Sequence, residues 1–442
     1  MKILPVSLGC DKNLVDSEKM LGILADRGYA FTDDEEEAEG ALVNTCCFIG
    51  DAKEESIQTL LRLAELRKSG QLKALVVGGC LSQRYQEQIR EEIPEVDACI
   101  GTMAITAVAD TFDAVLAGRS ENHYEPLSSD PTVETRRIVT TGGHFAYLKI
   151  AEGCDKNCTY CIIPKVRGPY RSVPMEALLR EAEELASAGV KELILVAQET
   201  TIYGKDLYGK KSLPELLHAL CGIEGIEWIR ILYGYPEELT EEIIETIATE
   251  PKICHYLDLP IQSASDRILR AMGRRTSQQS LREVIGRLRE RIPDICLRTT
   301  LIAGFPGETQ EDFEETYRFV NEMEFDRLGV FAYSQEEDTR AALLPDQVPE
   351  EVKESRREEL MELQQAVVFD RIEEMIGRKL TVMVEGKVAD EDVYVTRTYR
   401  DAPDVDGYLF LHTDATLNTG DFVKAKVTQA REYDLVGELI ND

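Results

Sequence analysis

The sequence predicts an α/β fold in three parts: an N-terminal parallel α/β domain, a central partial (β/α)6 barrel and a small, OB-like C-terminal β-barrel. Over residues 1–118, short apolar runs alternate with helical patterns. Six more strand candidates, separated by helical patterns, lie within residues 140–374, and residues 376–442 alternate apolar and polar side chains between Asp-Gly and Gly-Asp turns. A chain of 442 residues is also too long for one compact core.

The first domain follows a β-α-β-α-β-α order, which predicts a parallel sheet covered by helices on its faces. The expected strands are residues 3–8, 41–43 and 72–77, and the expected helices are residues 16–27, 51–68 and 83–91. After this domain, residues 119–141 are polar and contain two prolines, so we expect a linker there.

The second domain is expected to form an open barrel of parallel strands, where chemistry takes place at the carboxyl ends of the strands. The strand candidates are residues 146–150, 192–196, 228–232, 256–259, 297–303 and 327–331. A long amphipathic helix, at about residues 349–376, should lead from this domain into the third.

Net charge sets limits on the partners. The chain carries 50 basic and 82 acidic residues, a net charge of −32, and so repels phosphate backbones on average and suits a basic protein partner. Alternatively, the charge serves solubility alone. Residues 378–442 contain eight basic and thirteen acidic residues, a net of −5, which weakens an RNA-binding interpretation of the small barrel. With no apolar run of membrane length and no apolar signal core, we expect a cytoplasmic protein without membrane association.

Cysteine is the residue type that points to chemistry. Eleven cysteines and only five histidines, in a chain expected in a reducing compartment, favour thiolate ligation of iron–sulfur or zinc, or inert burial, over disulfides. The cysteines expected to be inert core residues are Cys99, Cys221, Cys254 and Cys296.

The segment EGCDKNCTYCIIP places Cys154, Cys158 and Cys161 directly after the first strand candidate of the barrel. This CxxxCxxC spacing lets one loop curl three thiolates around a single cluster. A 4Fe–4S cluster has four iron corners, so one iron stays open and can chelate the amino and carboxylate groups of S-adenosylmethionine (SAM). The alternatives are chance or a zinc loop, although zinc sites usually have four ligands in paired CxxC knuckles.

A second set of cysteines follows three strands of the N-terminal sheet. Cys10, the adjacent Cys46 and Cys47, and Cys80 each come just after a strand candidate. Because such strand ends share one edge of a parallel sheet, the thiols should converge. They form a second cluster site with one open iron or are simply buried cysteines. Only one of the adjacent pair is expected to point inward.

Candidate cofactor contacts lie where barrel strands end. Gln198 ends the second strand, Ser263 follows the fourth, and Gly304 opens GFPGE after the fifth, where a glycine admits a ligand or simply makes a turn. Tyr160, inside the cysteine loop, packs on the adenine or shields the cluster. Two arginines in RGPYRS bind the cofactor carboxylate or stabilise a loop; these are Arg167 and Arg171.

These motifs carry a family resemblance. CxxxCxxC with an aromatic residue before its third cysteine resembles the radical SAM superfamily, and the whole chain is similar to the methylthiotransferases, which join an N-terminal cluster domain, a radical core and a TRAM domain. SLGCDKNLVDSE, NTCCF and GGCLSQRY match the first-domain motifs of that family. The resemblance implies SAM and two 4Fe–4S clusters, with the radical cluster on Cys154, Cys158 and Cys161 as the catalytic set. It places the other cluster on Cys10, Cys46 and Cys80, and selects Cys46 because it directly follows Asn44–Thr45.

Within the family, GCDKNLVDSE, CIIPKVRGPYRS, VAQETTIYG and RDAPDVDGY resemble the branch that modifies the β-carbon of an aspartate in small-subunit ribosomal protein twelve. The alternative branch, MiaB type, modifies a tRNA adenosine and typically shows GCQMN and a GQNVNSY-like strand end. Ser263 is a departure, since the ribosomal branch often has histidine there. The implied partners are a basic protein of the small subunit, free or on the ribosome, an electron donor and a sulfur source.

The resemblance also implies a division of labour between the clusters. The radical cluster generates an adenosyl radical that removes hydrogen from the target carbon, and the other cluster holds a sulfur that a second SAM molecule methylates. A rival of another class is a non-catalytic iron–sulfur protein that binds RNA or ribosomes or transfers electrons. Two three-cysteine sets, each leaving an iron open, argue against that rival.

Overall fold

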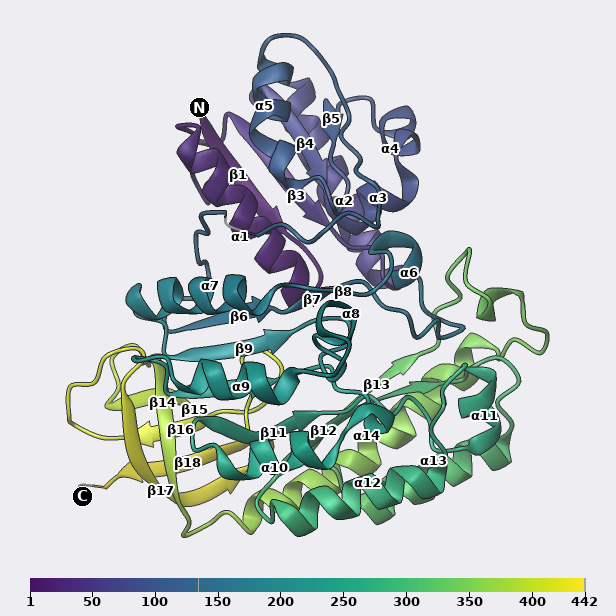
Figure 1. Ribbon diagram of the computed structural model, residues 1–442, viewed down its shortest axis with the longest axis vertical. Helices are drawn as coiled ribbons and strands as arrows, with labels where there is room; N and C mark the ends of the chain where they lie inside the picture. The colour runs from purple at the N-terminus through teal and green to yellow at the C-terminus, as the bar shows by residue number, and fades with distance from the viewer. Residues whose placement is uncertain (134, 441–442) are drawn as a thin grey trace.

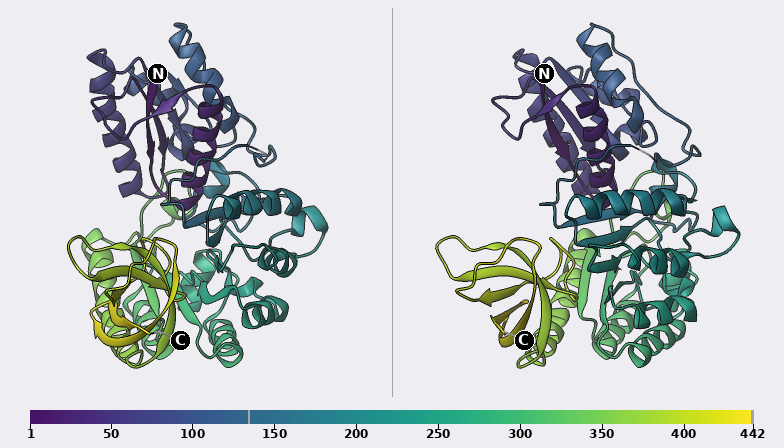
Figure 2. Two further views of the ribbon diagram at one scale, coloured as in Figure 1. Left: turned by 90° about the vertical axis from the view of Figure 1, so that its left-hand side faces the viewer. Right: turned by 60° about the vertical axis from the view of Figure 1, so that its left-hand side comes forward.

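The computed structural model describes residues 1–133 and 135–440. The N-terminal domain lies above the central domain, and the C-terminal barrel lies at the lower left, beside the central domain (Figure 1). Turning the molecule shows the barrel packed beside the central sheet and away from the N-terminal domain (Figure 2). The predicted fold class is confirmed in all three parts.

The N-terminal domain is a five-stranded parallel sheet in the order β2-β1-β3-β4-β5. Apolar clusters pack on both faces of this sheet. Its strands are β1 Lys2–Ser7, β2 Ala30–Phe31, β3 Gly40–Thr45, β4 Ala74–Gly78 and β5 Ala98–Cys99. Its helices are α1 Asp11–Asp26, α2 Gly50–Lys68, α3 Gly79–Tyr85, α4 Glu87–Glu92 and α5 Val108–Leu116, with a 3₁₀ turn at Ile105–Ala107.

The helix expected at residues 83–91 differs from the observed structure. The chain passes from β4 straight into α3 at Gly79, whose φ is +90°, so helix begins four residues earlier than expected. Gln86, with φ of 46°, then separates α3 from α4. A left-handed residue cannot continue a right-handed helix, and the predicted single helix is therefore two. As a result, Cys80 lies in the first turn of α3 rather than in a loop.

The central domain contains the six predicted parallel strands, in the order β13-β12-β11-β10-β9-β6. The strands are β6 Phe145–Lys149, β9 Glu192–Val196, β10 Trp228–Ile231, β11 Ile253–Asp258, β12 Cys296–Ala303 and β13 Arg327–Ala332. The longer helices are α7 Met175–Ser187, α9 Leu213–Cys221, α10 Glu241–Thr249, α12 Gln278–Arg291, α13 Gln310–Met323 and α14 Glu350–Glu373. Short elements are β7 Ala151–Glu152, β8 Arg171–Ser172, α6 Ile163–Val166, α8 Lys205–Tyr208, α11 Asp266–Ala271 and 3₁₀ turns at Pro236–Glu238 and Ala341–Leu343.

The C-terminal domain is a closed barrel in the order β14-β15-β16-β18-β17. Its strands are β14 Lys379–Lys387, β15 Val393–Thr398, β16 Leu409–His412, β17 Phe422–Arg431 and β18 Asp434–Leu439. Buried ion pairs fasten it to the central sheet. Glu192 of β9 accepts hydrogen bonds from Arg230 of β10 and Arg397 of β15, at 2.7 Å each, and all three side chains are fully buried.

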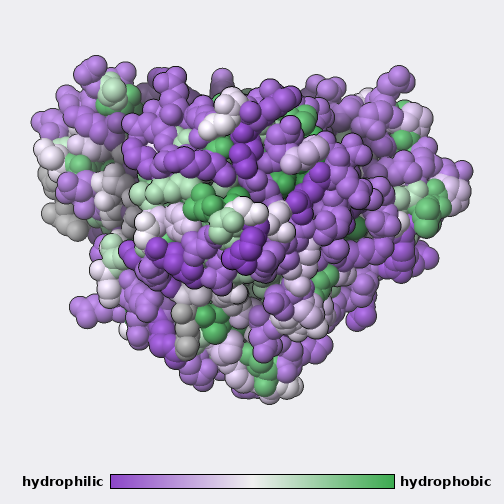
Figure 3. All heavy atoms as spheres, turned by 90° about the horizontal axis from the view of Figure 1, so that it is seen from above, coloured by the Kyte–Doolittle hydropathy of each residue, from purple (hydrophilic) through white to green (hydrophobic). Residues whose placement is uncertain are grey.

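Within the expected linker, Arg137 ties the chain to both domains that the linker joins. Arg137 donates to Glu18 of α1 at 2.7 Å and to Glu181 of α7 at 2.9 Å. The surface seen from above is largely hydrophilic, with apolar side chains only in small groups (Figure 3). None of the helices that the structure describes has both the length and the apolar character needed to span a membrane.

Candidate active site

The N-terminal cysteines lie at the carboxyl edge of three adjacent strands, as their positions in the sequence predict. Cys10 is the N-cap of α1 after β1, Cys46 follows β3, and Cys80 lies at the start of α3 after β4. Because β1, β3 and β4 are neighbours in the sheet, the three residues come together at one edge. The structure therefore brings this set into one place from three separate segments.

Cys46 and Cys47 point in different directions. A Cβ placed on Gly9 would lie only 2.7 Å from Cys46 Sγ, so this thiol faces the turn that precedes Cys10. Burial, followed by the neighbouring Cys80 and Cys10 thiols, raises the pKa of Cys46 to about 12. Cys47 is fully buried in an apolar cluster that also contains Cys80 and, from the central domain, Ile162 and Val166. This geometry favours Cys46 as the member of the set.

A buried charge network surrounds Cys80. Arg167, which comes from the central domain, donates from Nε to Cys80 Sγ at 3.3 Å and from Nη1 to Asp16 at 2.6 Å. It also contacts Asn13 and, at 3.1 Å, Glu152. The sequence pattern indicates Arg167 but not its partners, although GCDKNLVDSE carries Asn13 and Asp16 one helical turn apart. A contact of Arg167 with the cofactor carboxylate stays a prediction. Arg171 instead bonds the Leu127 carbonyl, the Met103 sulfur and the Arg167 carbonyl, which stabilises a loop.

Cys154, Cys158 and Cys161 lie in the loop that follows β7, at the carboxyl end of the first strand of the central domain. Cys154 and Cys158 are buried, and Cys161 is partly buried. Burial is the largest cause that raises the pKa of Cys154, to about 12, and the same effect raises the pKa of Cys161. Such thiols are neutral when free, so binding a cation or cluster here must release protons.

Aromatic rings and one arginine surround the middle cysteine. The Tyr235 hydroxyl lies 3.9 Å from Cys158 Sγ, and the Arg274 guanidinium stacks 4.3 Å from the centre of the Tyr235 ring. Tyr160 packs against an apolar cluster that includes Met272 and Phe305. This placement favours shielding as the role of Tyr160, although its contact with the adenine stays a prediction. The Tyr235 and Arg274 positions are not part of any cysteine motif, so the sequence offered no signal for them.

Glutamine side chains at two strand ends have free acceptor atoms. Gln198 Nε2 donates to Glu152 at 3.0 Å, while Gln198 Oε1 and Gln262 Oε1 are buried with no hydrogen-bond partner among the described residues. Gln262 also has a φ of 70°, an unusual conformation of the kind that clusters at ligand sites. Beside Gln198, burial raises the pKa of Glu199 to about 7, despite Lys156 at 3.3 Å. These groups fit a polar ligand at the strand ends.

Ser263 and Gly304 are occupied by structural contacts. Ser263 is buried, its hydroxyl lies 3.4 Å from that of Thr316 in α13, and it accepts from the Ser265 N–H at 3.2 Å. Gly304 has a φ of +72°, and a Cβ there would lie 2.3 Å from Cγ of Lys353 in α14. These contacts account for both residues without a cofactor, and their predicted cofactor contacts remain predictions.

Replacement of Gly304 by alanine is expected to destabilise the protein by about 2 kcal/mol or more, because the new methyl group overlaps Lys353 and the φ is left-handed. The measurement is the thermal unfolding midpoint of the cluster-free protein. Gly286→Ala serves as the control, since nothing lies within 4 Å of a Cβ at that position. An equal midpoint in the two variants would contradict the structural role of Gly304.

The donor chemistry of the two cysteine sets fits iron–sulfur clusters. Among residues 1–133 and 135–440, no three His, Cys, Asp or Glu side chains gather at the spacing of one metal ion. Thiolates on a 4Fe–4S cluster each bind a different iron, so they stand further apart than the ligands of one ion. Thiolate-only donor sets are typical of iron–sulfur sites. Of the cysteines expected in the core, Cys99, Cys254 and Cys296 are buried and Cys221 is partly buried.

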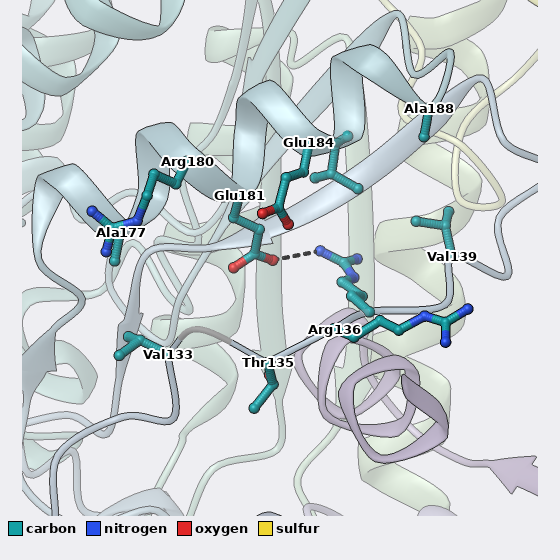
Figure 4. A pocket seen from close by; sticks show the side chains of 11 residues that line it. Val133, Thr135, Arg136, Val139, Ala177, Arg180, Glu181, Glu184 and Ala188 are labelled. Carbon is teal, nitrogen blue, oxygen red and sulfur yellow. Dashed lines mark hydrogen bonds and ion pairs between the residues drawn. The ribbon is translucent and has the colours of Figure 1, made fainter. Parts of the chain in front are cut away.

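A hollow of about 450 Å³ lies elsewhere, between the linker and α7 (Figure 4). The Glu181 carboxylate crosses it to meet Arg137. Residue 134, which lies between two of its lining residues, is outside the described part of the chain. The hollow contains no cysteine and is separate from both cysteine sets.

Comparison with known families matches each of the three parts. The Radical SAM superfamily matches residues 148–320, the Uncharacterized protein family UPF0004 matches residues 2–101, and the TRAM domain matches residues 376–440. The first two matches each contain one of the cysteine sets.

Relatives match along the whole chain. A ribosomal protein uS12 methylthiotransferase RimO of Lachnoclostridium phytofermentans is 60% identical over 99% of both chains. The chain belongs to the RimO methylthiotransferase family. The RimO protein of Acetivibrio thermocellus is 49% identical over 99% of this chain and 98% of its own length. The RimO protein of Clostridioides difficile is 48% identical over 100% of this chain and 99% of its own length. As a RimO-family member it is a radical SAM methylthiotransferase, which implies SAM and a 4Fe–4S cluster.

Solved structures extend the likeness of the fold. The radical SAM methyltransferase TsrM of Kitasatospora setae, solved with tryptophan and a SAM analogue, has a TM-score of 0.55 at 13% identity. The match covers 74% of this chain and 72% of TsrM. At this identity the match concerns the fold alone, which the RimO family shares with other radical SAM enzymes.

Proposed function

We propose that this chain attaches a methylthio group to the β-carbon of an aspartate in ribosomal protein uS12, and that it uses two 4Fe–4S clusters to do so. The observation that carries the proposal is the pair of three-cysteine sets, each at the carboxyl edge of a parallel sheet. The substrate follows from the relatives, which are named for uS12 and resemble this chain over almost its whole length. The acidic character of the chain supports a basic protein substrate.

Cys154, Cys158 and Cys161 would hold the radical cluster. When bound there, a 4Fe–4S cluster with an open iron supplies the electron that cleaves SAM and yields the radical. The surrounding residues would exclude water and orient the cofactor: Tyr160 lies within the cysteine loop and packs on an apolar cluster, and Gln198 presents a free buried oxygen at the strand end. With its pKa near 7, Glu199 can hold or release a proton beside Lys156 at neutral pH.

Cys10, Cys46 and Cys80 would hold the second cluster. Their three segments converge, and Cys46 faces the turn before Cys10. The three ligands leave one iron of such a cluster open for sulfur chemistry. Asn13 supports this edge by donating to the carbonyls of Leu8 and Thr45, at 2.9 and 3.0 Å, which ties β1 to β3. The N-terminal domain thus supplies a fixed ligand set and the central domain supplies the radical site.

The reaction also needs partners that come from outside the chain. An electron donor must reduce the radical cluster, and a sulfur source must replace the sulfur that each product carries away. Because uS12 belongs to the ribosome, we place the enzyme in the cytoplasm, where it meets its substrate free or on the small subunit.

The experiment that tests the proposal offers the anaerobically reconstituted protein two substrates, a uS12 peptide and a tRNA anticodon stem-loop. Each is incubated with reductant, sulfide and SAM and then analysed by mass spectrometry. The expected result is a mass gain on the peptide equal to SCH₃ replacing hydrogen. The same gain on the RNA would overturn the substrate, and release of 5′-deoxyadenosine with neither product would overturn both substrates. No release of deoxyadenosine would favour a non-catalytic iron–sulfur protein.

A further inference from the structure

One arginine side chain reaches from the radical domain into the other cysteine set. Arg167 follows Cys161 by six residues and lies just after α6. Its guanidinium leaves that domain and bonds Cys80 Sγ at 3.3 Å and Asp16 of α1 at 2.6 Å. The side chain is 1% exposed. The buried positive charge of Arg167, from the central domain, therefore lies beside Cys80, a proposed cluster ligand of the N-terminal domain.

The surroundings fix the direction in which Arg167 points. Glu152 of β7, which belongs to the same domain as Arg167, accepts a hydrogen bond from Arg167 Nη1 at 3.1 Å. Asn13 of the N-terminal domain accepts from Arg167 Nη2. Lys149 pairs with both Asp16 and Glu152, so it shares these carboxylates with the arginine. With the other nitrogens held in this way, Nε is left to face the sulfur. Arg171 lies four residues away, but among the described residues its side chain bonds Leu127, Met103 and the Arg167 carbonyl and not Cys80.

We propose that Arg167 is a positioning residue for the second cluster, which it serves by donating a hydrogen bond to Cys80 Sγ and by placing a positive charge beside it. The inference rests on the proposed function, which assigns a cluster to Cys10, Cys46 and Cys80. Hydrogen bonds to ligand sulfurs and nearby positive charge stabilise the reduced, more negative form of an iron–sulfur cluster. Arg167 therefore raises the reduction potential of this cluster, although it lies only six residues after the last radical cysteine, Cys161.

The test isolates the second cluster in the full-length chain by replacing Cys154, Cys158 and Cys161 with alanine. This parent is compared, after anaerobic reconstitution, with the same chain carrying Arg167→Gln, Arg167→Lys or Arg171→Gln. Iron content and an electron paramagnetic resonance redox titration are measured for each. Arg171→Gln is the matched control, because it removes a buried arginine of the same segment that does not contact Cys80.

The expected result for Arg167→Gln is an intact cluster whose reduction equilibrium shifts about tenfold toward the oxidised form, about 59 mV for one electron. Arg167→Lys keeps the positive charge but lacks the planar guanidinium, so the reduction potential should shift less than in Arg167→Gln. Arg171→Gln should match the parent. An unchanged potential in Arg167→Gln, with iron retained, would overturn the proposal, as would an equal shift in Arg171→Gln.

Two further outcomes are separable. A parent chain that binds no iron would refute the second cluster of the proposed function and would leave Arg167 without the ligand that its role requires. If iron is bound by the parent but lost in Arg167→Gln, the lysine variant decides. If the cluster in Arg167→Lys has a lower potential than the cluster in the parent, the positioning role is supported. If the two potentials are equal, the positioning role is contradicted.

Discussion

Replacement of Cys10 by alanine is expected to reduce methylthio product by about 100-fold or more while release of 5′-deoxyadenosine from SAM continues. Cys10 caps α1 in the N-terminal domain, at the edge shared with Cys46 and Cys80. The radical set lies in a different loop, after β7, and keeps all three of its thiols in this variant. Loss of one ligand should therefore remove sulfur insertion and leave cofactor cleavage. The two products are quantified in the same reaction by liquid chromatography and mass spectrometry.

Cys47→Ala is the matched control for this experiment. Cys47 lies directly beside Cys46, but it is fully buried and packs within an apolar cluster. Its loss should leave both deoxyadenosine and methylthio product, with only a small decrease in stability. Undiminished methylthio product in Cys10→Ala would refute the second cluster, and a loss of product in Cys47→Ala alone would show that the wrong member of the adjacent pair was assigned.

Replacement of Glu192 by alanine is expected to lower the free energy of unfolding by about 3–5 kcal/mol, because it leaves buried positive charge without its partner. Glu192 is the only carboxylate in an ion pair with Arg230 among the described residues, and it also pairs with Arg397 across the junction of sheet and barrel. Although burial alone would raise the pKa of Glu192, Arg397 and Arg230 hold it below its ordinary value. This contribution is therefore present at neutral pH and is lost as the pH falls through the lowered pKa.

The measurement is the unfolding midpoint of the cluster-free protein at neutral pH. Glu385→Ala is the control: Glu385 pairs with Arg397 at 2.7 Å, but its side chain is 18% exposed and Arg397 keeps Glu192. The midpoint should fall much further in Glu192→Ala than in Glu385→Ala. Equal midpoints would mean that water reaches Arg230 and Arg397 when Glu192 is absent.

The architecture could be predicted because each part has a strong periodic signal. Apolar strand runs separated by helical patterns are local features, and they identify the two parallel sheets and the strand ends that carry Cys10, Cys46 and Cys80. Strands β2 and β5 were missed because each has only two residues. The break at Gln86 was missed because nothing in an apolar pattern records a left-handed φ.

The side chains around the cysteines were harder to predict, because contacts between domains leave no periodic pattern. Arg167 is near the radical cysteines in the sequence, yet its guanidinium lies on Cys80 of the other domain. Gly304 ends a barrel strand as a ligand-binding glycine would, but the space beside it belongs to Lys353 of α14. Position at a strand end is thus a sound guide to where a site lies and a weaker guide to what each residue there does.

The buried charges at the junctions bear on how this protein can evolve. Three family descriptions match three separate stretches of the chain, which invites the view that its domains are interchangeable modules. Yet Asp16 and Glu18 of the first domain are paired with Arg167 and Arg137, and Glu192 of the second with Arg397 of the third. A recombined gene whose incoming domain lacked the matching residues would leave these buried charges without partners. Exchange between lineages is therefore favoured only where both sides of each junction are inherited together.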